Sequence, residues 1–182
     1  MVYLFLAEGF EEIEALTPVD LLRRAKIDVA TVGIGEKVVC GAHGIKVEAD
    51  LSEEEALAML KADGAEMVIL PGGMPGSTNL DNSQTVEAFL SYAKENDVPY
   101  GAICAAPMVL GKRGMLEGKK AVCYPGFEKY LLGAEVVDAP AVRDGKVVCG
   151  RAMGSAAQFA LLVIGVLRGE DVSREISQSI LL

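Results

Sequence analysis

The chain has 182 residues, of which 51% are hydrophobic and 24% are charged, and this length suits one compact domain, residues 1–182, with a core that needs no disulfide or metal. Its 26 acidic residues outnumber its 17 basic ones, and the net charge of -9 without a basic stripe excludes a typical nucleic-acid-binding protein. No apolar run is long enough to cross a membrane, and the N-terminal segment lacks the basic flank and cleavage site of a secretory signal, so we expect a cytoplasmic protein.

The first half of the chain alternates buried strands with amphipathic helices. Its predicted strands are Val2–Ala7, Ile27–Gly33, a hairpin of Val38–Cys40 with Ile45–Val47, and Met67–Leu70. Its predicted helices are Glu11–Arg24, a helix that starts at a capping box of Ser52 and Glu55 and runs to Lys61, and Ser83–Glu95. The Pro71-Gly72-Gly73 segment between them predicts a loop.

The second half continues the same alternation. Its predicted strands are Tyr100–Ile103, Ala121–Cys123, Val136–Val137, and a hairpin of Val142–Arg143 with Val147–Val148 around an Asp144-Gly145 turn. Its predicted helices are Ala105–Arg113, Gly154–Leu167 and a short one after Gly169. Strands separated by helices indicate a mostly parallel sheet covered on both faces, so the predicted fold class is α/β, doubly wound.

Cys104 lies where an apolar strand turns into a helix, in the segment Gly101-Ala102-Ile103-Cys104-Ala105-Ala106-Pro107. Small neighbours suit a tight turn, and Pro107 is tolerated in the first turn of a helix. A helix N-terminus favours a thiolate and so lowers the pKa of a cysteine. The segment therefore indicates a nucleophile, with a small buried cysteine as the alternative.

Three loops follow strand ends in the predicted sheet. They are the acidic segment that leads to Glu14, the Gly72-Gly73 pair, and the turn at Cys104. Sites in sheets of this kind collect at the carboxyl ends of the strands, so we expect the three loops to converge. For Glu14 a solvated helix face is the alternative.

The remaining cysteines and the single histidine indicate no further chemistry. Cys40, Cys123 and Cys149 lie on apolar, strand-like stretches and form no CxxC pair, so we expect free thiols and buried small residues. His43 precedes Gly44 and is interpreted as a turn residue. A Cys/His metal cluster lacks ligands, and no metal is predicted.

Three separated motifs then occur in one order: Glu11-Glu12-Ile13-Glu14 with Pro18-Val19-Asp20, Leu70-Pro71-Gly72-Gly73, and Ala102-Ile103-Cys104-Ala105-Ala106-Pro107. In these motifs the chain resembles the ThiJ/PfpI superfamily, and within it the parkinsonism-associated deglycase branch, over almost its whole length, including Arg151 and Gly154. The resemblance implies a flavodoxin-like fold, a homodimer, a reactive Cys104 and a carboxyl partner at Glu14.

The carboxyl partner has a physical role only in one protonation state. An ionised Glu14 would raise the pKa of a neighbouring thiol, whereas a protonated Glu14 can donate a hydrogen bond to the thiolate. We therefore predict a buried, neutral Glu14 within hydrogen-bond reach of Cys104. The resemblance also supports the N–H groups of Gly73 and Ala105 as an oxyanion hole, for which a simple chain turn at the glycine pair is the alternative.

Two departures from the family pattern bear on the reaction. Tyr124 precedes Pro125 where many relatives carry a histidine, which argues against a Cys-His dyad and protease chemistry; Tyr124 is expected to line the pocket or pack against its wall. Ala152-Met153 stands where close relatives carry Gly-Pro, so the pocket shape is expected to differ.

Two functions fit this prediction. The first is a cofactor-independent enzyme of the glyoxalase or deglycase type, in which Cys104 adds to a small reactive carbonyl such as methylglyoxal. The second is a non-enzymatic sensor or chaperone of oxidative stress, in which an oxidant converts Cys104 to a sulfinate. Tyr124 in place of a histidine argues against a third possibility, a hydrolase or amidotransferase activity.

Overall fold

Seven strands form the central sheet of the computed structural model, which describes residues 1–182. The strand order is β10-β11-β7-β6-β1-β2-β5, and every neighbouring pair is parallel except β10 with β11. The strands are β1 (Val2–Leu6), β2 (Val29–Gly33), β5 (Leu51–Ser52), β6 (Met67–Leu70), β7 (Tyr100–Ile103), β10 (Ala141–Asp144) and β11 (Val147–Gly150). Two small sheets lie outside it, one of β3 (Val38–Cys40) with β4 (Lys46–Glu48) and one of β8 (Lys120–Ala121) with β9 (Glu135–Val136).

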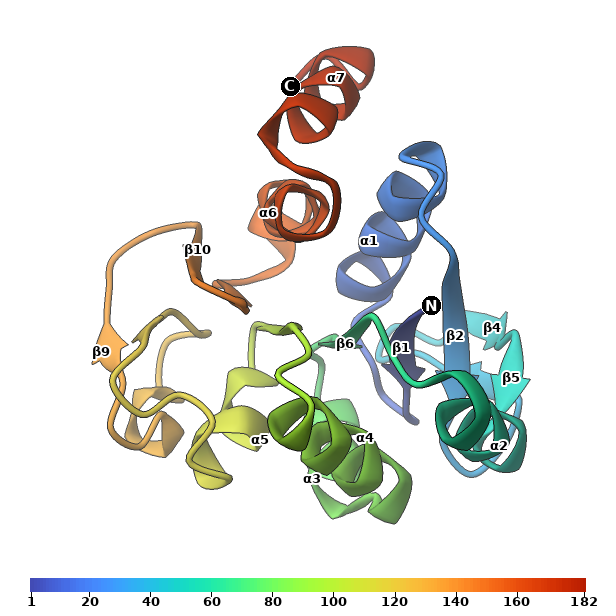
Figure 1. Ribbon diagram of the computed structural model, residues 1–182. Helices are drawn as coiled ribbons and strands as arrows, with labels where there is room; N and C mark the ends of the chain where they lie inside the picture. The colour runs from blue at the N-terminus through green and yellow to red at the C-terminus, as the bar shows by residue number, and fades with distance from the viewer.

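Helices cover both faces of the central sheet (Figure 1). One face carries α1 (Glu12–Arg24) and α6 (Ala156–Arg168), with α7 (Glu170–Ser179) packed on α6. The other carries α2 (Glu53–Asp63), α3 (Gly76–Asn82), α4 (Gln84–Glu95) and α5 (Pro107–Lys112). The predicted α/β, doubly wound, flavodoxin-like fold is confirmed.

The central strand β1 shows why helices must cover both faces of the sheet. All five of its residues are fully buried, and alternate side chains point to opposite faces of the sheet. Tyr3 and Phe5 pack against Phe89 of α4, with ring centroids 4.8 and 4.9 Å apart, whereas Leu4 and Leu6 join the core beneath α1 and α6. A strand that is apolar at every position requires this double cover.

The structure differs from the prediction mainly in short elements. Helix α3 follows the glycine-rich loop, where the sequence predicts no helix, and β5 and the 3₁₀ turns Glu128–Tyr130 and Met153–Ser155 are also additional. The second strand begins at Val29 rather than Ile27, and the last long helix begins at Ala156 rather than Gly154. The capping box of Ser52 and Glu55 is present, and it starts α2 as predicted.

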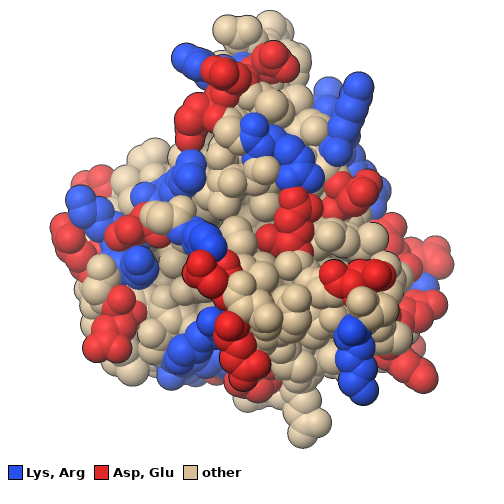
Figure 2. Space-filling view, in the orientation of Figure 1, with Lys and Arg blue, Asp and Glu red and all other residues tan.

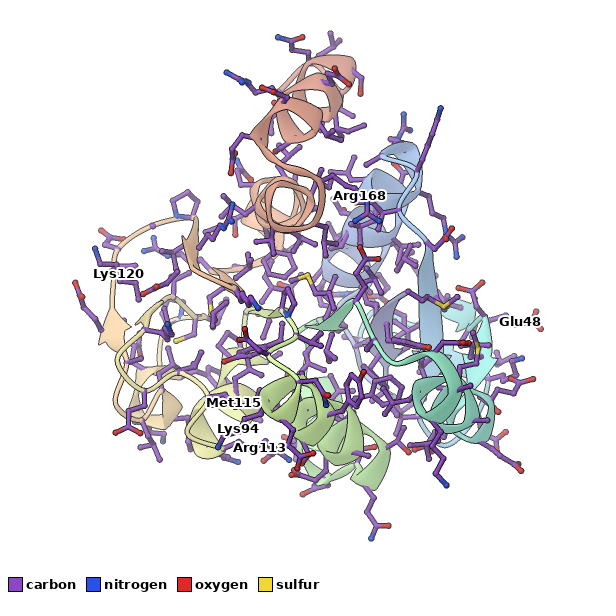
Figure 3. The ribbon with its side chains drawn as sticks, viewed as in Figure 1. Glu48, Lys94, Arg113, Met115, Lys120 and Arg168 are labelled. Carbon is purple, nitrogen blue, oxygen red and sulfur yellow. The ribbon has the colours of Figure 1, made fainter.

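Charged residues of both signs are interspersed over the face in Figure 2, and no continuous basic stripe crosses it. The two small sheets lie at opposite ends of the molecule, as the labelled Glu48 and Lys120 show (Figure 3). Arg168 at the end of α6 pairs with Glu66 just before β6, tying the last long helix to the sheet. None of the helices combines the length and the apolar character needed to span a bilayer.

Candidate active site

Cys104 occupies the sharp turn between β7 and α5. Its φ angle is 66°, a left-handed conformation that non-glycine residues rarely adopt and that costs free energy unless the surroundings enforce it. Two hydrogen bonds enforce it here: its N–H donates to the Gly150 carbonyl at 2.9 Å, and its carbonyl accepts from the Tyr124 N–H at 2.7 Å. The turn therefore holds the thiol at the carboxyl end of the sheet.

The helix after this turn is shorter than the sequence predicts. Helix α5 begins at Pro107 rather than Ala105 and has six residues, so it contributes little macrodipole to a sulfur three residues before its start. Pro107 takes the first helical position as expected. Any stabilisation of a thiolate must therefore come mainly from individual groups around the sulfur.

Glu14 lies on the buried side of α1 and has no exposed surface. Its Oε2 accepts a hydrogen bond from the Gly72 N–H at 3.0 Å, whereas its Oε1 is buried without a hydrogen-bond partner. A buried oxygen without a donor favours a bound proton, because an ionised carboxylate needs such donors or water. The alternative of a solvated helix face is wrong.

Gly72 lies where the side chains of Glu14 and Cys104 converge. A Cβ atom at this position would lie 2.4 Å from Oε2 of Glu14 and 2.5 Å from Cβ of Cys104. No real Cβ tolerates such distances, so only glycine fits between the two side chains. The predicted convergence of the first two loops with the Cys104 turn is therefore present.

The two side chains influence each other's protonation. Burial raises the pKa of Glu14 to about 7, with a contribution from the charge of Glu11, while the neighbouring Cys104 thiol and the hydrogen bond from the Gly72 N–H oppose the rise. Burial and the Glu14 carboxylate raise the pKa of the Cys104 thiol to about 12. This direction is opposite to the one expected from a helix N-terminus, because burial and an ionised neighbour outweigh the local donors.

The backbone N–H groups of Gly73 and Ala105 lie beside the sulfur of Cys104 and lower the pKa of its thiol. Gly73 has a φ angle of 92° and packs against the backbone of residues 9–11, where a Cβ atom would lie 2.4 Å from the Glu11 nitrogen. The structure thus brings together at one sulfur the two donors that the sequence comparison suggests. Two converging N–H groups can stabilise a developing negative charge.

Tyr124 and residues 151–153 complete the surroundings. The Tyr124 backbone binds the Cys104 carbonyl, but its side chain is 48% exposed and forms no hydrogen bond. Arg151 pairs with Asp138. The backbone of Met153 makes a small contribution that lowers the pKa of Glu14, and the sequence gives no signal for this proximity beyond the unusual Ala152-Met153 pair.

His43 is more than a turn residue. Its Nδ1 lies 2.8 Å from Oε2 of Glu12 and 3.5 Å from Oε2 of Glu11, and the three side chains form the one group with metal-ligating atoms within 4.8 Å of one another. Because His43 itself supplies the hydrogen bonds of the buried Glu12 carboxylate, the cluster is satisfied without an ion. The sequence gives no signal for this contact, because the two residues are 31 positions apart.

The other cysteines fit their predicted roles as free thiols. Cys123 and Cys149 are buried, and burial raises the pKa of Cys123 to about 11 and of Cys149 to about 12. Cys40 is partly exposed, and its Sγ faces the Gly41 carbonyl at 3.7 Å. None of the three has the backbone conformation or the donors found at Cys104.

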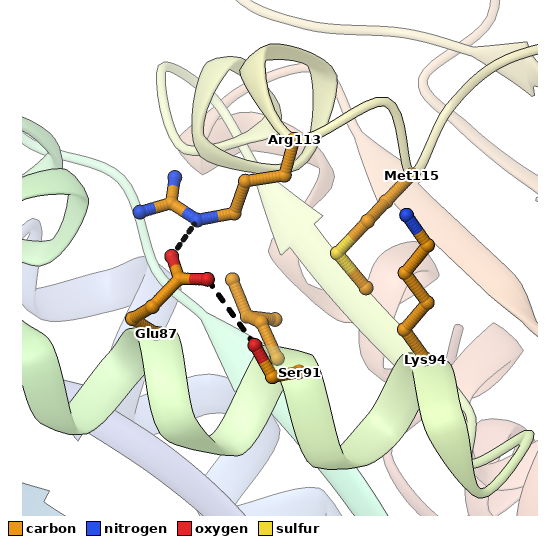
Figure 4. Close-up of a pocket in the computed structure, with 6 residues that line it drawn as sticks. Glu87, Ser91, Lys94, Arg113 and Met115 are labelled. Carbon is orange, nitrogen blue, oxygen red and sulfur yellow. Dashed lines mark hydrogen bonds and ion pairs between the residues drawn. The ribbon is translucent and has the colours of Figure 1, made fainter.

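A surface pocket of about 280 Å³ lies between α4 and the segment after α5, apart from these residues (Figure 4). Arg113 in its wall donates to Glu87 at 2.6 Å and to Asp81 at 2.7 Å. Its guanidinium is thus occupied by carboxylates and offers nothing to an anionic ligand. The cluster around Cys104 remains the candidate active site.

The chain is similar to known proteins over most of its length. The chain is 35% identical over 180 residues to protein dj-1beta of Drosophila melanogaster, covering 97% of this chain and 94% of that protein. A Pyrococcus abyssi protein named a deglycase is 31% identical over 155 residues, covering 84% of this chain and 90% of that protein. Protein DJ-1 homolog B of Arabidopsis thaliana is 35% identical over 175 residues, which are 94% of this chain but 39% of the plant protein.

Solved structures give the same result. Oxidised Toxoplasma gondii DJ-1 matches with a TM-score of 0.91 and 31% identity, covering 99% of this chain and 97% of that one. Drosophila DJ-1beta matches with a TM-score of 0.90 and 32% identity, covering 100% of this chain and 97% of that one. The family model described as DJ-1/PfpI matches residues 1–165. The chain therefore belongs to the DJ-1/PfpI family.

Proposed function

We propose that this protein is a cysteine-dependent enzyme that converts small reactive carbonyls, with Cys104 as nucleophile and Glu14 as proton carrier. The observation that carries the proposal is the meeting of these two side chains across Gly72, at a cysteine with a left-handed backbone. A buried carboxyl beside a thiol can exchange a proton with it directly, so that the thiolate forms as Glu14 becomes neutral. The net charge of the pair does not change in this exchange.

The reaction with methylglyoxal follows from these groups. The thiolate forms a bond to the aldehyde carbon, the carbonyl electron pair moves to oxygen, and this oxygen takes the proton from Glu14 to give a hemithioacetal. Glu14 then takes the hydrogen on that carbon as a proton and returns it to the neighbouring carbon. The hydroxyl proton passes to the former ketone oxygen, and the product is a thioester of a 2-hydroxy acid. Water hydrolyses the thioester to lactate and the free thiol, so that overall methylglyoxal and water give lactate and one proton.

The N–H groups of Gly73 and Ala105 fit this series of reaction steps. The alkoxide of the first step and the oxyanion of thioester hydrolysis both develop beside the sulfur, where N–H groups stabilise them. A deglycase reaction, as in the name of the Pyrococcus relative, uses the same nucleophile and expels an amine or a thiol instead. Neither version requires a metal or an organic cofactor.

The test is lactate formation from methylglyoxal, followed by proton NMR, with the wild-type protein and Cys104→Ser. The expected result is turnover by the wild type and only background with the variant. Equal rates would contradict the proposal. A panel of oxoaldehydes and glycated amines would then separate glyoxalase from deglycase activity.

A second candidate is an oxidation sensor, favoured by the same two donors. The oxygens of a Cys104 sulfinate could accept hydrogen bonds from Gly73, Ala105 and a protonated Glu14. The oxidised Toxoplasma relative adopts the same fold. This reading predicts that oxidation of Cys104 changes thermal stability or partner binding, and it requires no turnover.

We also propose a homodimer. Ile13 and Leu16 on α1 are 48% and 37% exposed, and apolar residues on the outer face of a helix beside the active site suit a protein interface. Light scattering after gel filtration should give twice the mass of 19.2 kDa. A monomer at micromolar concentration would contradict this proposal but not the chemistry at Cys104.

A further inference from the structure

The tip of the β3–β4 hairpin is joined to the segment that precedes α1. The Gly9 N–H donates to the Cys40 carbonyl at 2.9 Å, and the Ala42 N–H donates to the Phe10 carbonyl at 2.8 Å. The hairpin belongs to a separate two-stranded sheet, so these bonds are its direct connection to the active-site loop. Whatever fixes the tip also fixes residues 9–12.

His43 adds a second link between the hairpin tip and this segment by binding the carboxylate of Glu12. Its backbone N–H donates to Oε1 of Glu12 at 2.8 Å, and its ring Nδ1 lies 2.8 Å from Oε2, so one residue engages both oxygens of the carboxylate. Glu12 is 3% exposed, whereas the His43 side chain is 67% exposed. A buried carboxylate needs such donors, and because its partner accepts only, Nδ1 carries the ring proton.

Gly41 provides the room for this contact. A Cβ atom at position 41 would lie 2.4 Å from Oε1 and 2.5 Å from Cδ of Glu12. The hairpin tip is therefore built around the Glu12 carboxylate, with a glycine beneath it and a histidine over it. A methyl group at position 41 would push the carboxylate away from His43.

The same segment is bonded to the groups around Cys104. The Glu11 N–H donates to the Gly72 carbonyl at 2.9 Å, and the Gly72 N–H donates to Oε2 of Glu14 at 3.0 Å. Gly73 packs on the Glu11 nitrogen, which sets where its own N–H points. Hydrogen bonds thus link the hairpin tip, through residues 10–11, to Gly72 and the Glu14 carboxyl, and a packing contact links the same segment to Gly73.

We propose that His43 is a positioning residue for the active site: its ring hydrogen bond to Glu12 holds the 9–12 segment, and through Gly72 and Gly73 this segment fixes the geometry around Cys104. The inference adds a remote residue to the function proposed above and rests on that function only for turnover. Reactivity of the thiol itself can be measured without it.

The charged groups around the ring are few. Glu12 at the start of α1 and Glu11 just before it face the ring, and hydrogen bonding to Glu12, together with the charges of both, raises the pKa of His43. Because Nδ1 carries a proton in the cation and in the bonded neutral ring alike, the contact persists when His43 loses its charge. Positioning by a hydrogen bond and tuning by charge can therefore be separated by substitution.

The experiment measures the rate constant for alkylation of Cys104 by iodoacetamide as a function of pH, with the modified peptide quantified by mass spectrometry. The variants are His43→Ala, which removes the ring donor, and His43→Asn, whose amide places an uncharged donor near the position of Nδ1. Gly41→Ala displaces Glu12 independently. Lys46→Ala is the matched control, because Lys46 is an exposed residue of the same hairpin.

We expect His43→Ala and Gly41→Ala to slow alkylation about threefold to tenfold near neutral pH, because small displacements at a reacting centre cost rate. We expect His43→Asn and Lys46→Ala to stay within about twofold of the wild type. Circular dichroism checks that each variant is folded, and the exposure of His43 makes unfolding of its variants unexpected.

Two results would overturn the inference. One is a pH profile of His43→Ala that superimposes on that of the wild type, which would show that the hairpin tip does not reach the thiol. The other is His43→Asn as slow as His43→Ala, which would assign the effect to charge. If lactate formation is absent but His43→Ala still slows alkylation, the proposed function fails while the positioning role holds.

Discussion

The carboxyl of Glu14 and the thiol of Cys104 titrate as a pair, because the two side chains meet at Gly72 and each shifts the pKa of the other. Their apparent pKa values belong to the pair rather than to one residue. After the first proton leaves, the remaining one can reside on sulfur or on oxygen. The reactive form is the one in which it resides on oxygen.

The first prediction concerns the pH dependence of this pair. Because the pKa of Glu14 is raised to about 7, alkylation of Cys104 should rise through about pH 7, where the pair passes from two protons to one, and then reach a plateau. Rates from about pH 4 to about pH 10 test this. A rate that starts to rise only in the alkaline range, as for an isolated buried thiol, would show that the shared proton stays on sulfur.

The second prediction separates donor from charge at Glu14. In Glu14→Gln the side chain keeps an N–H donor for the thiolate, whereas Glu14→Leu keeps neither donor nor charge. The Cys104 thiol should therefore have a lower pKa in the Gln variant than in the Leu variant, measured by thiolate absorbance or alkylation. Equal values would rule out the donor role of Glu14.

The third prediction concerns Gly72. In Gly72→Ala the added methyl group must displace Glu14 or Cys104, so alkylation and turnover should fall at least about tenfold. Overpacking should also lower the free energy of unfolding by about 1 to 3 kcal/mol. Gly154 has open space at its Cβ position, and Gly154→Ala should change stability by less than about 0.5 kcal/mol. Urea denaturation measures both, and equal stabilities would contradict the close approach at Gly72.

The fourth prediction concerns stability in acid. Burial opposes the ionisation of Asp81, but hydrogen bonds from Lys112 and Arg113 outweigh it and lower its pKa. A lowered folded-state pKa gives stability that is complete above the unfolded value of about 4 and is lost as the pH falls through the folded value. Asp81→Asn should therefore lower the free energy of unfolding by about 2 kcal/mol at neutral pH.

The difference between the wild type and Asp81→Asn should shrink as the pH falls below about 4. Urea denaturation at a series of pH values measures it. Asp171→Asn, in the exposed pair with Arg174, is the control and should have no measurable effect. A difference between the wild type and Asp81→Asn that is constant with pH would show that the Asp81 charge is not responsible.

The fifth prediction concerns oxidation. Mild peroxide should add two oxygen atoms to Cys104 before it modifies Cys123 or Cys149, because Cys104 is partly exposed and adjoins a carboxyl that can take its proton, whereas Cys123 and Cys149 are buried. Peptide mass spectrometry gives the order of modification. Faster oxidation of a buried cysteine would contradict the special status of Cys104.

The main features of the fold, and Cys104 and Glu14 as the central residues of the candidate site, could be predicted from sequence because they depend on local patterns. The strand Met67–Leu70 has its predicted bounds, as does Tyr100–Ile103, because uniformly apolar runs end abruptly at the proline and glycine of one loop and at the turn of Cys104. Parallel strands then place the ends of both runs at one edge.

What could not be predicted depends on contacts between distant segments. Helix α3 lacks a side-chain cap and follows Pro75, and it is held by the bond from the Gly76 N–H to Gly9 and by the buried Leu80. His43 meets Glu12 across 31 positions of sequence. The burial of Glu14 likewise depends on a distant residue, because Gly72 packs against its carboxyl. The acidic residues next to Glu14 in the sequence would instead suggest an exposed helix face.

The backbone of Cys104 is tethered on both sides, by Gly150 and by Tyr124. When an adduct grows on the sulfur, the main chain cannot yield to make room, and only rotation about the Cα–Cβ bond is available. Any group attached to the Cys104 sulfur, whether a carbon from a sugar or an oxygen, must consequently face the N–H groups of Gly73 and Ala105. The scaffold thus offers a single orientation to very different chemical substituents.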